Sequence, residues 1–261
     1  MMKNILKKII PNSLLSLVQK TLIEIRRKRD LVDEENSLDF KRRKSFYEQF
    51  LKKGSTYFDI GANYGNRISP IIKLNVGLIV AVEPQEACCN YLKAKYKGIT
   101  VLQNGVGEIE ETKTFYLSSD SVLSSFSKDF IAKTSDTRFV GNTWDNTTQV
   151  HIITLDSLIE KYGLPDFVKV DVEGFELEVF KGLSNSLKVV SFEYTVPELN
   201  DVLLSIIDRL ESLGCCKFNY SIGESMEFSL TGWVTSKIFK SIVLSDDFIT
   251  TGFGDVYTRF E

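Results

Sequence analysis

Histidine and cysteine are scarce in this sequence, which limits the chemistry open to it. His151 is the single histidine among 261 residues, so a zinc hydrolase site, or any mechanism that needs several histidine ligands, is excluded. The four cysteines form two adjacent pairs, Cys88-Cys89 and Cys215-Cys216. This spacing fits neither a zinc site nor a framework of separated disulfides. We therefore expect reduced cysteines with a structural role.

Long apolar runs are missing as well. No stretch approaches the roughly 20 apolar residues that a membrane-spanning helix needs, and lysines and a proline interrupt residues 1–20, unlike a secretory signal. Apolar residues make up 43% of the chain and the formal net charge is -3, values typical of a soluble protein with one sizeable core. We expect a cytoplasmic protein.

Charge divides the chain into two parts. Residues 1–53 hold 14 Lys or Arg and 7 Asp or Glu, so the rest of the chain carries a net charge of -10. Apolar residues recur at helical spacing over residues 14–25, which predicts an amphipathic helix, and a second basic helix is expected to end near Gly54. Two interpretations of the first helix stay open. Residues 1–30 could contact an anionic membrane surface or lipid-linked substrate, or the helix could pack on the domain with its basic face in solvent.

From residue 54 onward, short apolar segments alternate with amphipathic ones. Strands are predicted at residues 56–60, 78–82, 100–102, 150–154, 167–170, 189–194 and 256–259, and helices at 67–74, 86–97, 156–162, 175–183 and 198–213. The alternation predicts an α/β fold with a doubly wound, mainly parallel, seven-stranded sheet. We expect a catalytic domain over 54–261 and a helical extension over 1–53, with residues 118–149 and 221–255 as insertions or loops over the site.

The first predicted strand runs into a turn of small residues, Gly61-Ala62-Asn63-Tyr64-Gly65. In an open α/β sheet, ligands bind at this end of the strand. The glycines permit positive φ and close approach of the backbone, and Asp59 can face an ammonium group. A dinucleotide loop would read G-x-G-x-x-G, whereas Asn63 replaces the second glycine and the preceding acid repels pyrophosphate. The turn therefore suits a cationic ligand.

The second predicted strand ends in another acid, at Glu83-Pro84. A carboxylate in this position can accept hydrogen bonds from both hydroxyls of an adenosine ribose. Either acid alone is explained as well by a helix cap or a solvated strand end. Together, Asp59 and Glu83 predict a cradle for a cationic adenosyl ligand, S-adenosylmethionine.

These residues resemble the FkbM family of class I methyltransferases, through D-I-G-A-N-x-G at 59–65 and E-P at 83–84. The resemblance continues in order over about residues 55–195. Residues 104–107 are similar to the family's loop after the third strand, Ser124-Ser125 to its serine pair, 154–158 to its T-L-D-x-L segment and 166–182 to its D-F-x-K-x-D-x-E-G-x-E-x-x-V-x-x-G block. Gly105 and Phe126 depart from the family, which usually has alanine and leucine there.

The resemblance implies a Rossmann-like fold, O-methyl transfer and S-adenosylmethionine as the cofactor. The residues that it assigns to cofactor binding are Asp59, Gly61, Asn63, Gly65, Glu83, Pro84, Asn104 and Val106.

Three acids are the candidate catalytic residues, namely Asp171, Glu173 and Glu193 at the ends of two predicted strands. A neutral hydroxyl is a poor nucleophile, so a carboxylate that accepts its proton assists methyl transfer. We predict Asp171 or Glu173 as the general base, although Glu173 and Glu176 could instead cap the following helix, an interpretation that applies most strongly to Glu176. Three carboxylates would also suit Mg²⁺ or Ca²⁺, but no metal is expected. Lys169 is expected to pair with one of the acids or to extend along the sheet edge.

The predicted function is O-methylation of a glycan or sugar-containing metabolite, without a nucleic-acid partner because the domain is acidic. Aromatic residues in the irregular segments would either stack on a sugar or cover the core: Phe126, Phe139, Trp144 and Trp233. An alternative acceptor is a polyketide, lipid or other small alcohol, which predicts an apolar pocket. Less favoured alternatives are a non-catalytic binding protein with the same fold and a dinucleotide oxidoreductase.

Overall fold

The computed structural model describes residues 37–261. The predicted amphipathic helix and the membrane contact through residues 1–30 lie outside the described residues. Residues 44–261 form one compact unit. Helix α3 spans Leu38–Tyr47 and therefore ends before the predicted stop near Gly54. The turn that follows allows Tyr47 to pack its ring against Tyr57 and Phe167. No helix within the described part of the chain is long and apolar enough to cross a bilayer.

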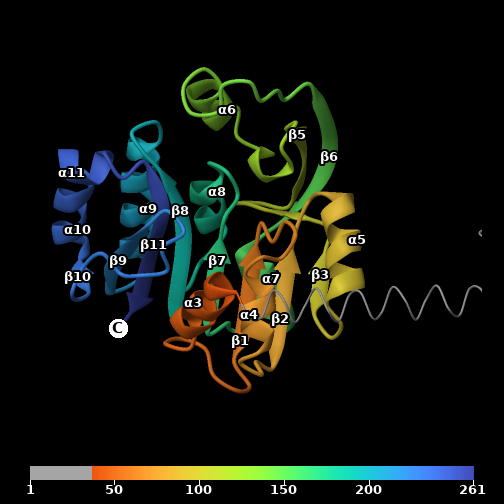
Figure 1. The fold of residues 1–261 in the computed structure, drawn as a ribbon, viewed down its shortest axis with the longest axis horizontal. Helices are drawn as coiled ribbons and strands as arrows, with labels where there is room; N and C mark the ends of the chain where they lie inside the picture. The colour runs from red at the N-terminus through yellow and green to blue at the C-terminus, as the bar shows by residue number, and fades with distance from the viewer. Residues whose placement is uncertain (1–36) are drawn as a thin grey trace, which may run out of the picture. The chain divides into compact units, whose positions relative to one another are not determined.

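The main sheet confirms the predicted α/β class and contains one strand more than expected (Figure 1). Its order is β10-β9-β11-β8-β7-β1-β2-β3, with parallel pairing from β8 to β3 and antiparallel pairing among β8, β11, β9 and β10. The strands are β1 Thr56–Ile60, β2 Leu78–Val82, β3 Thr100–Leu102, β7 Phe167–Val170, β8 Val189–Thr195, β9 Cys216–Ile222, β10 Val234–Thr235 and β11 Phe253–Phe260.

Helices cover both faces of this sheet, as the doubly wound prediction requires. All five predicted crossover helices form within two residues of their expected ends: α4 Ile68–Ile72, α5 Glu86–Lys95, α7 Leu155–Tyr162, α8 Glu176–Lys181 and α9 Asn200–Ser212. Neighbouring residues of a strand point to opposite faces. Phe58 accordingly joins the core beneath α7, α8 and α9, while Tyr57 joins the core beneath α4 and α5.

A second sheet corrects the prediction for residues 150–154. Residues 150–153 belong to β6 (Asn146–Ile153), which pairs with β4 (Gly105–Val106) and β5 (Glu111–Leu117) and not with the main sheet, and Thr154 caps the following helix. Val150 and Ile152 are buried, but the residues from Asn146 to Gln149 are exposed. This one-sided burial is typical of an antiparallel sheet with one face in solvent. The short segment 150–154, considered without its neighbours, does not show it.

The two irregular segments differ from the prediction in different ways. Residues 118–145 do form an excursion between β5 and β6, with η1 (Ser121–Leu123) and α6 (Lys128–Thr134) inside it. Residues 221–255 are not mainly a loop, because they include β10, α10 (Ser236–Val243) and α11 (Asp246–Ile249). Phe239, Val243 and Phe248 are buried in the main core. Apolar residues recur at helical spacing in α10, at Ile238, Phe239, Ile242 and Val243, so the sequence did carry a signal for this helix that the loop prediction overlooked.

Candidate functional site

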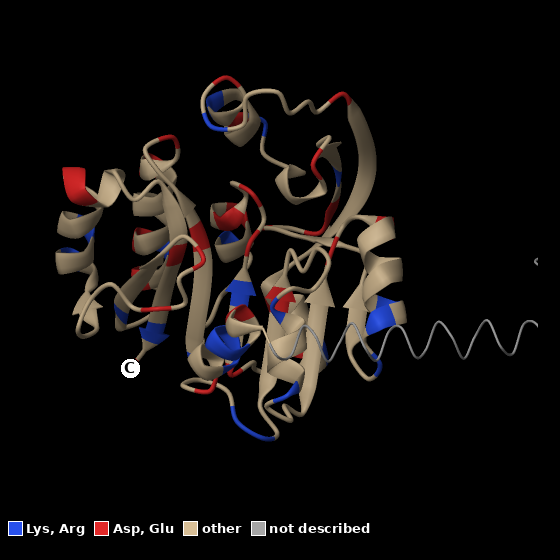
Figure 2. Cartoon of the chain, in the orientation of Figure 1, with Lys and Arg blue, Asp and Glu red and all other residues tan. Residues whose placement is uncertain are grey.

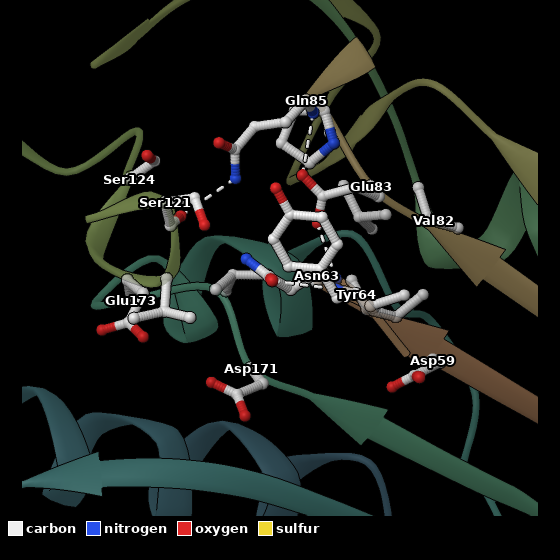
Figure 3. Close-up of a pocket in the computed structure, with 18 of the residues that line it drawn as sticks. Asp59, Asn63, Tyr64, Val82, Glu83, Gln85, Ser121, Ser124, Asp171 and Glu173 are labelled. Carbon is white, nitrogen blue, oxygen red and sulfur yellow. Dashed lines mark hydrogen bonds between the residues drawn. The ribbon is translucent and has the colours of Figure 1, made fainter. Parts of the chain in front are cut away.

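A cavity of about 280 Å³ lies at the carboxyl ends of β1, β2, β7 and β8 (Figure 3). Ten of the eleven residues proposed from the sequence line it: Asp59, Gly61, Asn63, Glu83, Pro84, Asn104, Val106, Asp171, Glu173 and Glu193. Gly65 is not among the lining residues. The fold therefore brings the proposed cofactor and catalytic residues into one cavity, from segments that are distant in sequence.

The glycines of the turn after β1 are required by close packing. Gly61 has a φ of 82°, and a Cβ atom there would lie 1.8 Å from the carbonyl oxygen of Asp171. Gly65 has a φ of 76°, and a Cβ atom there would lie 2.7 Å from Leu92 of helix α5. Gly61 thus brings the loop against the acidic segment after β7, whereas Gly65 seats the loop on α5 behind the cavity.

Glu83 is held in place by two backbone groups of the cavity wall. Its two carboxylate oxygens accept hydrogen bonds from the N–H groups of Asn63 and Gln85, each at 2.8 Å (Figure 3). Burial raises the pKa of Glu83 to about 7, against the opposing effect of these two hydrogen bonds. Each carboxylate oxygen can still accept a further bond. Glu83 therefore fits the vicinal hydroxyls of a ribose.

Asp59 is 3% exposed at the end of β1. Burial raises its pKa to about 6, and the positive charge of Arg67 opposes this rise. A buried carboxylate gains from a cationic ligand and would repel a pyrophosphate. Asp59, Glu83 and the open approach at Gly61 together fit S-adenosylmethionine, which carries an ammonium and a sulfonium group.

The wall opposite the main sheet comes from the second sheet and the excursion after β5. Asn104 donates from Nδ2 to the carbonyl oxygen of His151 at 3.1 Å, and Val106 is buried in β4. Gly105 and Phe126, the two departures from the family pattern, are neighbours here. A Cβ atom at Gly105 would lie 2.6 Å from Cζ of Phe126, so the smaller residue at 105 accommodates the larger one at 126.

Polar contacts anchor the excursion at several points. Gln85 donates from Nε2 to the carbonyl oxygen of Ser121 at 3.0 Å, and Ser125 donates from Oγ to the carbonyl oxygen of Glu173 at 2.6 Å. Farther along, Nη2 of Arg138 lies 3.0 Å from a carboxylate oxygen of Glu198. The excursion is therefore attached to the cofactor side, to the acid-bearing loop and to the main sheet.

The candidate catalytic acids form a compact cluster. One carboxylate oxygen from each of Asp171, Glu173 and Glu193 lies within 4.8 Å of the others. Burial raises the pKa of Glu173 and Glu193 well above the usual value, and the negative charge of Asp171 adds to the rise. Figure 2 shows acidic residues on the loop between β7 and α8, which carries Asp171 and Glu173, whereas Glu193 lies in β8.

Glu176, not Glu173, caps the loop that precedes α8. A carboxylate oxygen of Glu176 accepts hydrogen bonds from the N–H groups of Val172 at 3.1 Å and Gly174 at 3.3 Å. Glu173 has a φ of 53°, a left-handed conformation that is uncommon outside glycine and is often found at functional sites. The capping interpretation therefore applies to Glu176 and leaves the Glu173 carboxyl available to the cavity.

A hard cation would find suitable donors in the three acids. Asp171, however, already has two cationic partners, because Nζ of Lys169 and Nη2 of Arg67 each lie 3.4 Å from its Oδ2 atom. These charges compete with a divalent cation for this carboxylate.

Three of the four aromatic residues considered as sugar platforms serve packing. Phe139 packs on Phe130, Trp144 donates to the carbonyl oxygen of Leu123, and Trp233 packs on Phe50 and Phe228. Phe126 is the member of the set that lines the cavity.

The sequence did not single out Arg67, Gln85, Ser121, Glu224 or Asp255, although the first four line the cavity and Asp255 binds Lys169. Arg67 had a weak signal, since it stands two residues after the glycine turn. Asp255 also had a weak signal in the sequence, because it is an acid directly before the predicted strand at residues 256–259.

Comparison with known proteins gives one family. Residues 59–221 match the description "Methyltransferase FkbM domain". A search of curated protein sequences gives no match. The match to the family spans more than half of the chain and is the finding on which the assignment rests.

Solved structures with a similar chain path include three methyltransferases. A TehB-like SAM-dependent methyltransferase from Corynebacterium glutamicum aligns at 10% identity over 93% of this chain and 99% of its own, with a TM-score of 0.45. A precorrin-6y C5,15-methyltransferase from Geobacter metallireducens aligns at 13% identity over 84% and 87%, with a TM-score of 0.40. A ribosomal protein L11 methylase from Lactobacillus delbrueckii aligns at 10% identity over 84% and 78%, with a TM-score of 0.42.

Proposed function

Since the chain belongs to the FkbM methyltransferase family, we propose that it methylates a hydroxyl group of a glycan or sugar-containing metabolite with S-adenosylmethionine. The observation that carries the proposal is the joining of two acid sets in one cavity. Asp59 and Glu83 suit the cofactor, and Glu173 and Glu193 suit a hydroxyl acceptor.

S-adenosylmethionine supplies the methyl group on a positively charged sulfur. The protein must therefore bind the cofactor, align the acceptor and exclude water, and alignment contributes most of the rate. Asp59 offers its carboxylate to the ammonium group, and Glu83 offers its carboxylate to the ribose. The turn at Gly61 lets the backbone approach, because no side chain stands between it and Asp171.

Proton removal from the acceptor is assigned to the pair of Glu173 and Glu193. Two neighbouring half-buried carboxyls titrate together and hold one proton more tightly than isolated acids do. A carboxylate with a raised pKa is a stronger base, and a stronger base takes the proton of a hydroxyl more readily. Asp171 is paired with Lys169 and Arg67, so we assign it a positioning role. Of the two residues predicted as the general base, Asp171 and Glu173, we therefore favour Glu173.

The lining supports a polyhydroxyl acceptor. Six acids line the cavity, Asp59, Glu83, Asp171, Glu173, Glu193 and Glu224, against one arginine, Arg67. Carboxylates accept hydrogen bonds from several hydroxyls and repel a phosphate. A polyketide or lipid alcohol would require a mainly apolar wall at the acceptor end. If the acceptor carries a phosphate, that group lies outside the cavity.

The test uses the full chain. Binding of S-adenosylmethionine and of NAD is measured by calorimetry, and release of S-adenosylhomocysteine is followed with neutral glycosides, sugar phosphates and long-chain alcohols. We expect cofactor binding, no NAD binding and the highest turnover with neutral glycosides. Higher turnover with the long-chain alcohols would show that the acceptor is an apolar alcohol and not a sugar. NAD binding without S-adenosylmethionine binding would overturn the function itself.

A further inference from the structure

We propose that Arg67 is a positioning residue that couples the cofactor half of the cavity to the acceptor half, through ion pairs with the acids after β7 and β9. The inference rests on the proposed function. It assigns to Arg67 a role in cofactor affinity that neither the sequence motif nor the family match specifies.

Polar side chains form a row across one face of the main sheet. In-register pairing places Asp59 beside Lys169, Lys169 beside Ser191, and Ser191 beside Tyr257. Lys169 is completely buried. The small side chain of Ser191 leaves room for Lys169 to reach across β8 to Asp255 on β11, with which it forms an ion pair.

A second row lies one step nearer the cavity. Glu193 pairs in register with Asp255, and Asp171 follows Lys169 by two residues. Residues two apart along a strand point to the same face, so these acids lie on the face that carries Lys169. Burial alone would raise the pKa of Asp255, but the charges of Lys169 and Arg67 lower it below the usual value.

Arg67 connects the rows to the cofactor loop. It is the N-cap residue of α4, two residues after Gly65 of the glycine turn, and its side chain is 14% exposed. Its Nη2 atom lies 3.1 Å from a carboxylate oxygen of Glu224, 3.4 Å from Asp171 and 3.8 Å from Asp255. One guanidinium therefore contacts segments that follow β7, follow β9 and begin β11.

The positive charge of Arg67 also acts on Asp59, the acid of the cofactor half. This charge opposes the rise in the pKa of Asp59 that burial causes. Other titratable and charged groups also surround this cluster, from several elements that pack against it: Tyr47, Tyr57, Glu83, Lys169, Asp171, Glu173, Glu193, Glu224, Asp255 and Tyr257. Any change in how Asp171 pairs with Arg67 is therefore felt at Asp59.

Loss of the guanidinium has two consequences under this proposal. Asp59 becomes harder to ionise, so S-adenosylmethionine binds more weakly and its binding requires a higher pH. Asp171 loses one of its two cationic partners. A substitution at Asp171 should therefore change cofactor affinity by a different factor in the Arg67 variant than in the wild type. A residue that only fills space would produce neither effect.

The experiment measures S-adenosylmethionine Kd from pH 6 to 8.5 for the wild type, Arg67→Gln, Arg67→Lys and Arg209→Gln. For Arg67→Gln we expect a Kd about tenfold higher at pH 7 and a binding midpoint at higher pH, with partial recovery in Arg67→Lys. Arg209 is a matched control, because it is partly buried and bonds backbone carbonyls of Phe180 and Leu183 outside the cavity. Arg209→Gln should leave Kd and midpoint unchanged.

A double-mutant cycle on the same Kd completes the test. Arg67→Gln and Asp171→Asn should be non-additive by at least about twofold, as residues in contact are. Near-ultraviolet circular dichroism checks folding, and if Arg67→Gln does not fold, Arg67→Lys replaces it in the cycle. Wild-type Kd and midpoint in a folded Arg67 variant, or strict additivity, would overturn the coupling. Failure of the wild type to bind S-adenosylmethionine would instead overturn the proposed function.

Discussion

Gly105 and Phe126 fit each other as a small and a large residue, because a Cβ atom at position 105 would lie 2.6 Å from Cζ of Phe126. Both positions line the cavity, and both depart from the pattern that the chain otherwise resembles. The two departures thus compensate each other in the structure.

This fit predicts a compensating pair of substitutions. Gly105→Ala alone should destabilise the protein by about 1–3 kcal/mol, as overpacking of a filled site does. Combining it with Phe126→Leu should remove much of that loss, because the ring that the new methyl group meets is gone. Urea denaturation of the two single variants and the double variant measures the interaction energy. A purely additive cycle would show that Ile152, the other close neighbour, determines the cost.

The acid pair predicts a separation of catalysis from cofactor binding. Glu173→Gln and Glu193→Gln should each lower kcat by about 10²–10⁴-fold, the range for loss of a general base, while S-adenosylmethionine Kd stays within a few-fold of wild type. Glu178→Gln is the matched control, since Glu178 bonds Lys181 on the exposed side of α8. Near-normal turnover in both cavity variants would contradict the assignment of the base.

The pKa values of the cofactor acids predict the pH dependence of binding. Burial raises the pKa of Glu83 to about 7 and that of Asp59 to about 6. The ionised forms bind the cofactor, and they prevail above these values. Affinity should therefore be greatest near pH 8 and should fall as the pH decreases through 7 and then 6. Calorimetry in buffers with different heats of ionisation should also detect proton release on binding below pH 7.

Chelation tests the charge balance at Asp171. Lys169 and Arg67 already neutralise this carboxylate, so we expect EDTA to leave turnover unchanged and added Mg²⁺ or Ca²⁺ to give no activation. A loss of activity with EDTA that Mg²⁺ restores would assign the three-acid cluster to a metal ion instead.

Local features were predictable from the sequence. The strand from Thr56 to Ile60 and the turn that follows it depend on neighbouring residues: buried apolar side chains, then glycines where φ is positive. The acid at Glu83 follows from the same logic, because parallel strands end at one edge of the sheet.

Features that depend on pairing between distant segments were not predictable. Lys169 does pair with Asp171, one of the acids that the sequence offered, but its nearer partner is Asp255, 86 residues later, which the sequence did not indicate. The strand β6 has the composition of a sheet strand, but composition does not reveal which sheet it joins. Helix α11, with four residues, is too short to show a helical period. Arg67 acquires its role from side chains that the sheet brings to it.

The excursion between β5 and β6 has a consequence for how ligands enter and leave. It is fastened at Ser121, at Ser125 and at Arg138, where Nη2 also donates to the carbonyl oxygens of Val196 and Gly252. Contacts at these separate places restrain the excursion against moving away from the rest of the cavity wall. We therefore expect spent cofactor to leave, and fresh cofactor to enter, through the mouth of the cavity past the exposed side chains of Tyr64 and Val122, with these contacts intact.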